Sequence, residues 1–314
     1  MAEVEARARM QTHRLRPAQI SRSVDASAIR CANGQTTSRG SAAALACEQR
    51  GTEPTCRLAY HAAMRVRLDD LVAEADSLLG TGAFDEGAPS NGLLVRAPGE
   101  EVRRIGASVN TSFEAIEAAH EAGVDFLLVH PPTWPHIDLG LQRQKEELLT
   151  GYGISLYGAH ASLDCATGIG TADALAELLE VRILGRFAEY VGGQAGIHGT
   201  AEGTFEAFTG RLEGAISTPP TITRNAEAFG HVAIVAGGGG LTAWLAEAKA
   251  LGADTYVTGE GSMFTSLYAR ETGLNLVLGT HYATEAPGIQ KLAGELSRRL
   301  GLDWLFLEES DPSR

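Results

Sequence analysis

From Arg67 onward, short apolar segments alternate with amphipathic ones, and this alternation constrains the fold more than any other feature. The apolar segments are nearly continuous, as in VDFLLVH, HVAIVA and LNLVLGTH. Between them, segments such as TSFEAIEAAHEAG and LQRQKEELLTGYG have helical periodicity and end at a glycine. Nearly continuous apolar strands are typical of parallel sheets that helices cover on both faces. The sequence therefore predicts an α/β fold with mostly parallel sheets.

The predicted elements form two related lobes, at about 67–180 and 231–307, separated by a less regular insertion at about 181–230. The stretch MRVRLDDLVAEADSLL, which begins at Met64, is amphipathic and predicts a helix. Residues 64–314 are therefore expected to form the folded α/β domain.

Residues 1–63 differ from the rest of the chain in charge and in periodicity. They contain nine arginines, no lysine and five acidic residues, a net charge of +4, which leaves −17 for the remainder, given a total of −13. Their polar, weakly periodic composition predicts a disordered extension. A translation start at Met64 is an equally open interpretation. A transit peptide is a third, although Glu3 and Glu5 count against it.

Composition excludes several functional classes. The chain is 44% hydrophobic, enough to bury a core, but no stretch approaches 18 consecutive apolar residues, so we expect no membrane span. An acidic surface repels phosphate backbones, so we expect no nucleic-acid partner. The four cysteines have neither zinc-finger spacing nor a convincing disulfide framework, which predicts a reducing, cytoplasmic location.

Three predicted strands end in a histidine: His130 after FLLV, His160 after SLYGA and His281 after LVLGT. Ligands bind beyond the carboxyl ends of strands in open α/β sheets. A single histidine there is more often a capping residue, but three of them favour a shared site. The prolines that follow His130 in VHPPTWP would stiffen its presentation.

Two pairs of residues have the spacing of one helical turn. His281 and Glu285 lie in GTHYATEAPG, before a helix expected to begin near Pro287, and a helical turn there would let both side chains hold one cation. His160 and Asp164 repeat the spacing in GAHASLDCATG, where Asp164 could ligate while His160 orients it. An ordinary surface pair or a helix cap explains either spacing alone. Imidazole with carboxylate suits Zn, Mn, Fe or Co.

A glycine run offers a competing site. In HVAIVAGGGGLTAWLAEA, Gly238, Gly240 and Ala243 satisfy G-x-G-x-x-A, and Glu260 follows the next strand. This pattern is typical of a phosphate-binding loop or a dinucleotide site. No G-x-S-x-G is present, and Cys165 has no activating motif, so a serine or cysteine nucleophile is not expected.

Five segments, taken in order, resemble the dinuclear-metal-centre hexameric family of GTP cyclohydrolase I type 2 homologues. They are PSNGLLV, GVDFLLVHPPTW, YGAHASLD, ADTYVTGEGSMF and LGTHYATE, and the resemblance runs from about Arg67 to Leu307. It implies a ring-shaped hexamer, opening of the guanine ring of GTP with loss of formate, and four metal ligands. The implied ligands are His130, Asp164, His281 and Glu285.

The chain departs from the family pattern at two positions. Pro131 and Phe264 stand where the family has histidines. Two cations need a bridging carboxylate and many donors, so four protein ligands suit one cation better than two. Water, or a nearby group such as His136, His160 or Glu260, would have to complete a second site. The sequence therefore leaves open whether each subunit binds one divalent cation or two.

The first functional hypothesis is a metal-dependent hydrolase with a nucleotide-like small-molecule substrate. The cation would activate a water, and His160 or Glu260 would move the proton. The alternative is a non-catalytic metal-binding scaffold, chaperone or regulatory protein, which the loss of two family histidines would suit. A dinucleotide-dependent oxidoreductase is the third hypothesis.

Overall fold

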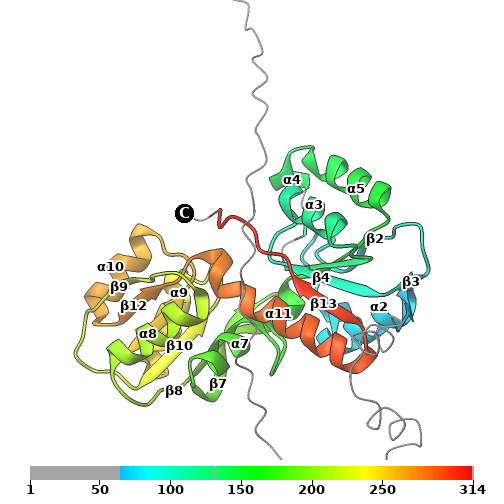
Figure 1. Ribbon diagram of the computed structural model, residues 1–314. Coiled ribbons are helices and arrows are strands. Elements are labelled where there is room, and N and C mark those ends of the chain that lie inside the picture. Colours follow the sequence, from blue (N-terminus) through cyan, green and yellow to red (C-terminus); the bar gives the residue numbers. More distant parts are fainter. Residues whose placement is uncertain (1–63, 131, 134, 313–314) are drawn as a thin grey trace, which may run out of the picture. The chain divides into compact units, whose positions relative to one another are not determined.

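The computed structural model describes residues 64–312 except Pro131 and Trp134 (Figure 1). These residues belong to the unit Thr55–Arg314, and the predicted extension, residues 1–63, lies outside the described residues. Helices and two large β-sheets make up the described part, so the predicted α/β class is confirmed. No helix among the described residues is both long and apolar enough to cross a membrane.

The first sheet has five strands and is largely parallel. Its spatial order is β13 (Asp303–Phe306), β4 (Arg104–Ser108), β5 (Phe126–Val129), β6 (Ser155–Ala159) and β2 (Asn91–Val95). Only β2 runs antiparallel to its neighbour. All residues of β5 and β6 are buried, as the continuous apolar pattern predicted.

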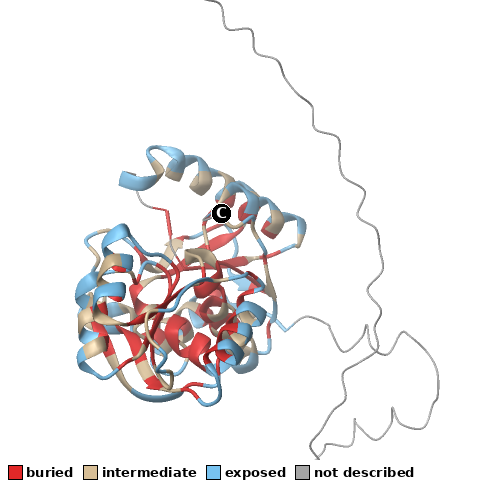
Figure 2. Ribbon diagram, turned by 90° about the vertical axis from the view of Figure 1, so that its left-hand side faces the viewer, coloured by how far each residue is buried: buried red, intermediate tan, exposed pale blue. Residues whose placement is uncertain are grey.

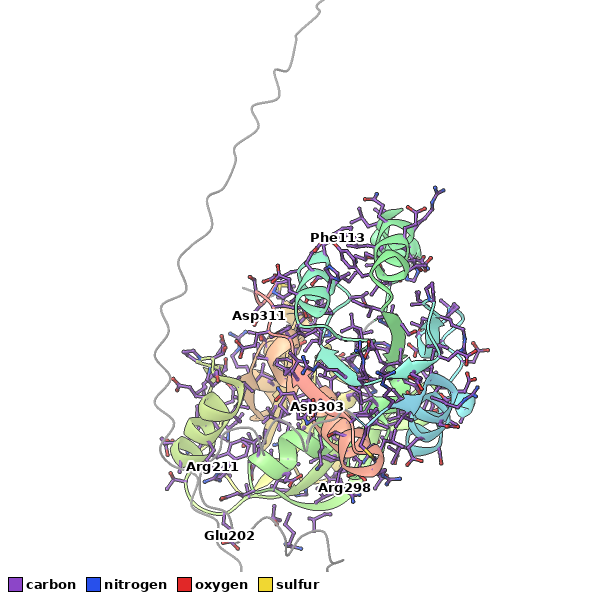
Figure 3. All side chains as sticks on the ribbon, turned by 45° about the vertical axis from the view of Figure 1, so that its right-hand side comes forward. Phe113, Glu202, Arg211, Arg298, Asp303 and Asp311 are labelled. Atoms are coloured by element: carbon purple, nitrogen blue, oxygen red, sulfur yellow. The ribbon has the colours of Figure 1, made fainter. Side chains whose placement is uncertain are left out.

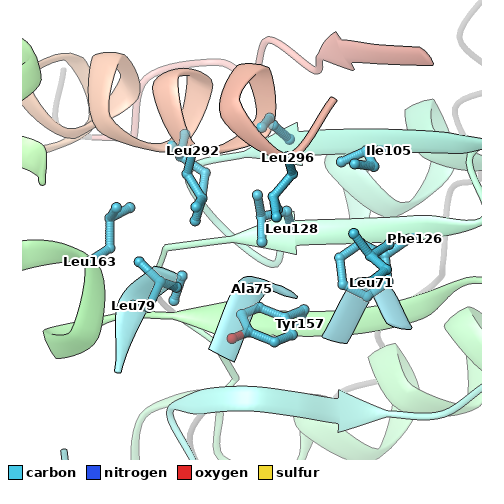
Figure 4. Packing of buried hydrophobic residues seen from close by; sticks show 14 of the residues in the cluster. Leu71, Ala75, Leu79, Ile105, Phe126, Leu128, Tyr157, Leu163, Leu292 and Leu296 are labelled. Carbon is cyan, nitrogen blue, oxygen red and sulfur yellow. The ribbon is translucent and has the colours of Figure 1, made fainter. Parts of the chain in front are cut away.

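Helices cover both faces of this sheet, and each face has its own core. Residues of α2 (Leu68–Leu79) and α11 (His281–Leu300) pack on one face, where Leu71 and Leu292 belong to the same hydrophobic cluster as Phe126 and Tyr157 (Figure 4). Residues of α3 (Phe113–Glu121) and α5 (Leu141–Tyr152) pack on the other face. Figure 2 shows the buried residues gathered along the strands and the inward sides of the helices.

The second sheet has six strands and is mixed. Its spatial order is β7 (Arg182–Tyr190), β8 (Gly193–Thr200), β10 (His231–Val235), β11 (Thr255–Thr258), β12 (Asn275–Leu278) and β9 (Thr221–Thr223). The central strands β10, β11 and β12 are parallel, and the flanking strands are antiparallel. Helices α7 (Thr171–Leu178) and α8 (Phe205–Ile216) pack on one face, and α9 (Thr242–Ala250) and α10 (Met263–Thr272) on the other.

The tertiary structure places two segments differently from the sequence-based lobes. Strands β7, β8 and β9, expected in a separate insertion at 181–230, complete the edges of the second sheet because β8 pairs with β10 and β9 with β12. Strand β13, expected in the second lobe, pairs with β4 of the first sheet. Local patterns in the sequence do not specify which distant strand an edge strand pairs with.

The remaining elements are short. They are β1 (Val66–Arg67), which pairs with β3 (Glu101–Val102), the 3₁₀ turn η1 (Thr81–Ala83), α4 (Pro135–Asp138) and α6 (Ala161–Asp164).

Helix α11 begins earlier than expected. It starts at His281 rather than near Pro287, because the Thr280 hydroxyl caps the helix by accepting a hydrogen bond from the Ala283 amide at 3.1 Å. Pro287 lies inside the helix. The segment from His281 to Glu285 is therefore helical, which was the condition for the two side chains to share one face.

Candidate metal centre

His130 follows β5 directly and is almost completely buried, with 1% of its side chain exposed. Its Nδ1 donates a hydrogen bond to the carbonyl oxygen of Ala159 at 2.8 Å. Its Nε2 lies 3.4 Å from Asp164 Oδ1 and 3.5 Å from Glu285 Oε1, and it has no hydrogen-bond partner among the described residues. A buried nitrogen that makes no hydrogen bond is costly unless an ion pair or a ligand satisfies it, and here its neighbours are two carboxylates at ion-pair distance.

The two carboxylates come from different elements. Asp164 ends the short helix α6, and its Oδ1 accepts a hydrogen bond from the Thr171 hydroxyl at 2.7 Å. Glu285 lies in the first turns of α11, with 5% of its side chain exposed, and its Oε2 has no partner among the residues that the structure describes. Their approach to His130 brings carboxylate oxygens from two separate helices to one point.

His281 completes this group from the side of the second sheet. Its Nε2 lies 2.9 Å from Glu285 Oε1, and its Nδ1 lies 2.9 Å from Oε1 of Glu260, which follows β11. Both His281 and Glu260 are more exposed than His130 and Glu285. Glu260 therefore connects the buried group to solvent.

His160 follows β6 and has a partner that sequence reasoning missed. Its Nδ1 lies 2.5 Å from Oε2 of Glu86, in the loop before β2. One ligand atom each of His130, His160 and Asp164 lie within 4.8 Å of one another. No spacing motif connects residues so far apart in the chain, so no sequence signal pointed to Glu86.

The glycine run packs against these side chains. A Cβ atom on Gly237 would lie 1.9 Å from Glu285 Oε1, and the φ angle of Gly237 is +62°. The Gly237 carbonyl accepts hydrogen bonds from the amides of Gly259 and Glu260 at 3.0 Å. At Gly237, glycine is required by the close approach of Glu285, so this part of the run has a packing role beside the site.

The other positions singled out in the sequence lie elsewhere. His136 is exposed on α4 and belongs to no group of three potential ligands found among the described residues. Phe264 is 62% exposed in α10. Pro131 lies outside the described residues.

Opposing pKa shifts show how charge is balanced in the group. Burial alone would lower the pKa of His130, but the carboxylates of Asp164 and Glu285 raise it overall. Burial alone would raise the pKa of Glu285, and His130 and His281 lower it overall. The pKa of His281 is likewise raised by Glu285 and Glu260 against the effect of burial. The carboxylates therefore stabilise positive charge at this point.

A cavity of about 700 Å³ opens beside the group. The candidate residues His130, His160, His281, Glu260 and Glu285 all contribute to its lining. The segment before α3 and the C-terminal segment line another part of it (Figure 3 labels Phe113 and Asp311 in this region).

The C-terminal segment is fixed against α3. Glu309 accepts hydrogen bonds from the Ser108 hydroxyl at 2.6 Å, the Asn110 amide at 3.0 Å and the Ser112 hydroxyl. This carboxylate therefore satisfies polar groups at the start of α3.

Pairwise contacts link these imidazoles and carboxylates, because His130 lies against Asp164 and Glu285, and His281 lies against Glu285. Among the described residues, the group whose ligand atoms all lie within 4.8 Å of one another is His130, His160 and Asp164, a possible metal site of histidine and aspartate. Among the described residues, His130 Nε2 and Glu285 Oε2 are buried polar atoms without a hydrogen bond, and a bound cation would satisfy them.

Comparison with known proteins gives the family. The family described as Duf34/NIF3 (NGG1p interacting factor 3) matches residues 66–312. A Deinococcus radiodurans protein named "GTP cyclohydrolase 1 type 2 homolog" is 31% identical over 245 residues, which cover 76% of this chain and 92% of that protein.

Two solved structures share the fold. The protein ybgI, a protein of unknown function, has a TM-score of 0.71 and 27% identity, and TTHA1606 from Thermus thermophilus has a TM-score of 0.68 and 30% identity. Each comparison covers 79% of this chain and 100% of the other. The chain belongs to the Duf34/NIF3 family.

Proposed function

We propose that this protein is a metal-dependent hydrolase whose cation is held by His130, Asp164, His281 and Glu285. The observation that carries the proposal is the buried Nε2 of His130, which faces two carboxylates and has no hydrogen-bond partner among the described residues. When bound, a divalent cation lowers the pKa of water and polarises the group under attack.

The chain's own residues would orient the cation and move the proton. His130 is held by its hydrogen bond to the Ala159 carbonyl, which leaves Nε2 directed at the carboxylates. Glu260 contacts His281 and is half exposed, so it is suited to exchange a proton with solvent. His160 lines the same cavity and is the second candidate for this role.

The substrate class comes from the relatives. Several are named GTP cyclohydrolase 1 type 2 homologs, which supports a nucleotide-like small molecule and ring-opening hydrolysis. We further propose a cytoplasmic homo-oligomer, a hexamer by resemblance to the family, with one or two cations per subunit. Light scattering of the purified protein measures the subunit number.

A non-catalytic metal-binding scaffold, chaperone or regulatory protein is the second candidate. Pro131 and Phe264, which replace family histidines, favour it. In this case the protein binds the cation but turns over no substrate.

Metal analysis combined with a substrate screen tests both proposals. We expect at least one equivalent of cation in the wild-type protein, and loss of both cation and turnover in His281→Ala and Glu285→Ala. Turnover of GTP or related compounds that follows metal occupancy supports the hydrolase. Metal binding without any turnover supports the scaffold, and full activity in either variant contradicts the site.

A further inference from the structure

We infer that Glu86 is a positioning residue that turns His160 into an additional nitrogen ligand of the cation. The inference rests on the proposed metal binding and adds two residues to it. The observation behind it is the pair formed by Glu86 and His160, whose side chains are only 10% and 16% exposed.

The Glu86 carboxylate is fixed by three donors. Its Oε1 accepts hydrogen bonds from Asn91 Nδ2 at 2.7 Å and from the Ala161 amide at 3.2 Å. Its Oε2 lies 2.5 Å from His160 Nδ1. Oε1 therefore binds Asn91 and Ala161, and Oε2 contacts His160. The carboxylate cannot rotate without losing these hydrogen bonds.

The backbone that carries His160 is fixed by Asn91, the first residue of β2. The Asn91 side-chain oxygen accepts hydrogen bonds from the amide of His160 at 3.0 Å and from that of Ser162 at 3.1 Å. Asn91 thus holds both the carboxylate and the chain segment whose histidine the carboxylate contacts.

This arrangement selects one tautomer of His160. A carboxylate accepts hydrogen bonds, so the proton of the neutral imidazole lies on Nδ1 and the lone pair lies on Nε2. Histidine ligands of metals commonly donate their other ring N–H to a carboxylate, which fixes the ring and raises its basicity.

His160 is close enough to join the proposed ligands. Its ring centroid lies 5.1 Å from that of His130, and ligand atoms of His130, His160 and Asp164 lie within 4.8 Å of one another. Donors of one cation lie at most about 4 Å apart, because each bond is about 2.0–2.2 Å long. The three residues therefore lie close to the spacing of ligands of one cation, and on cation binding His160 would supply an imidazole that Pro131 cannot.

Cobalt(II) titration of the full-length protein tests the inference, with visible absorption as the readout of ligation. The variants are Glu86→Gln, His160→Ala and the double variant. In Glu86→Gln, the donors Asn91 and Ala161 hold the amide oxygen, so its NH₂ group faces His160 and favours the tautomer with the proton on Nε2.

We expect Glu86→Gln to weaken cobalt binding by about 10–100-fold, as loss of an outer partner of a ligand does. Because Glu86 acts through His160, the double variant should bind cobalt no more weakly than His160→Ala alone. Unchanged affinity and spectrum in Glu86→Gln, or additive losses in the double variant, would overturn the inference.

Asp76→Asn is the matched control. Asp76 also accepts side-chain hydrogen bonds within the first sheet's core region, from Tyr157 at 2.7 Å and Thr81 at 2.8 Å, but it contacts none of the proposed ligands. It should lower the melting temperature without changing cobalt affinity.

Two further measurements separate the possible failures. A wild-type protein that binds no cobalt contradicts the proposed function and this inference together, whereas normal wild-type binding with an unaffected Glu86→Gln contradicts this inference alone. If Glu86→Gln does not fold, ¹⁵N imidazole spectra of the zinc-loaded wild type decide. A proton on Nε2 of His160 overturns the inference.

Discussion

The two sides of the candidate metal centre differ in their access to water. On the side of the first sheet, His130 is 1% exposed, and on the side of the second sheet, His281 is 39% exposed. The first sheet presents its histidine from the end of a buried strand, whereas the second presents its histidine from a helix start. Under the proposed function, the buried side would fix the geometry of the site, and the exposed side would exchange ligands and protons with solvent.

Substitution of the buried histidine His130 should have the largest effect on metal affinity. In His130→Ala, Asp164 and Glu285 lose the imidazole that faces them, so we expect metal affinity to fall by more than the roughly 100-fold that loss of an outer partner costs. Cobalt titration or metal analysis after dialysis measures this. Retention of a full equivalent would show that His130 is not a ligand.

Substitution of Gly237, which lies against Glu285, should have the next largest effect on stability and metal affinity. In Gly237→Ala, the new methyl group meets the Glu285 carboxylate and the residue must keep a positive φ, so we expect a loss of about 2–4 kcal/mol in unfolding free energy and weaker metal binding. Chemical denaturation and cobalt titration measure the two effects.

Gly238→Ala is the control for that variant. A Cβ on Gly238 would lie 3.5 Å from His281 Cε1, an ordinary contact. Equal effects of the two substitutions would contradict the packing role assigned to Gly237.

Added imidazole should separate the two sides directly. Imidazole reaches the 39% exposed position of His281 more readily than the 1% exposed position of His130, although both residues line the cavity. At millimolar imidazole, we therefore expect a larger recovery of metal binding in His281→Ala than in His130→Ala. Equal recovery in both variants would contradict the difference in access.

The smallest expected effect concerns a titratable pair away from the site. His198 Nδ1 lies 3.0 Å from His231 Nε2, and burial together with His231 lowers the pKa of His198. The unfolded chain then takes up a proton more readily, so stability is lost as the pH falls through the unfolded value of about 6.5. Urea unfolding at pH 7.5 and 5.5 should show a slightly smaller decrease for His198→Gln. An identical pH dependence would contradict this.

Local sequence patterns were sufficient to predict much of the fold and of the candidate site. The apolar segments became buried strands because strand burial depends on a short stretch of sequence, and His130 lies at the end of such a strand. The spacing of His281 and Glu285 placed both on one helix face, since helical geometry fixes which residues are neighbours.

Those local patterns did not predict which strands distant in the sequence pair with one another. The sequence places β13 in the second lobe and β7, β8 and β9 in a separate insertion, because the pairing of β8, β9 and β13 depends on partners far away in the chain. The contact between Glu86 and His160 joins two loops whose separation in sequence follows no motif.

The sequence by itself determined the α/β class, the strand-end histidines and the residue types that can hold a cation, because each depends on local periodicity and side-chain chemistry. Only the tertiary structure decided that His130 faces Asp164 and Glu285, that Gly237 lies against Glu285 and that Glu86 holds His160. These contacts join residues from different elements, and strand pairing and tertiary packing, rather than local sequence, bring those elements together.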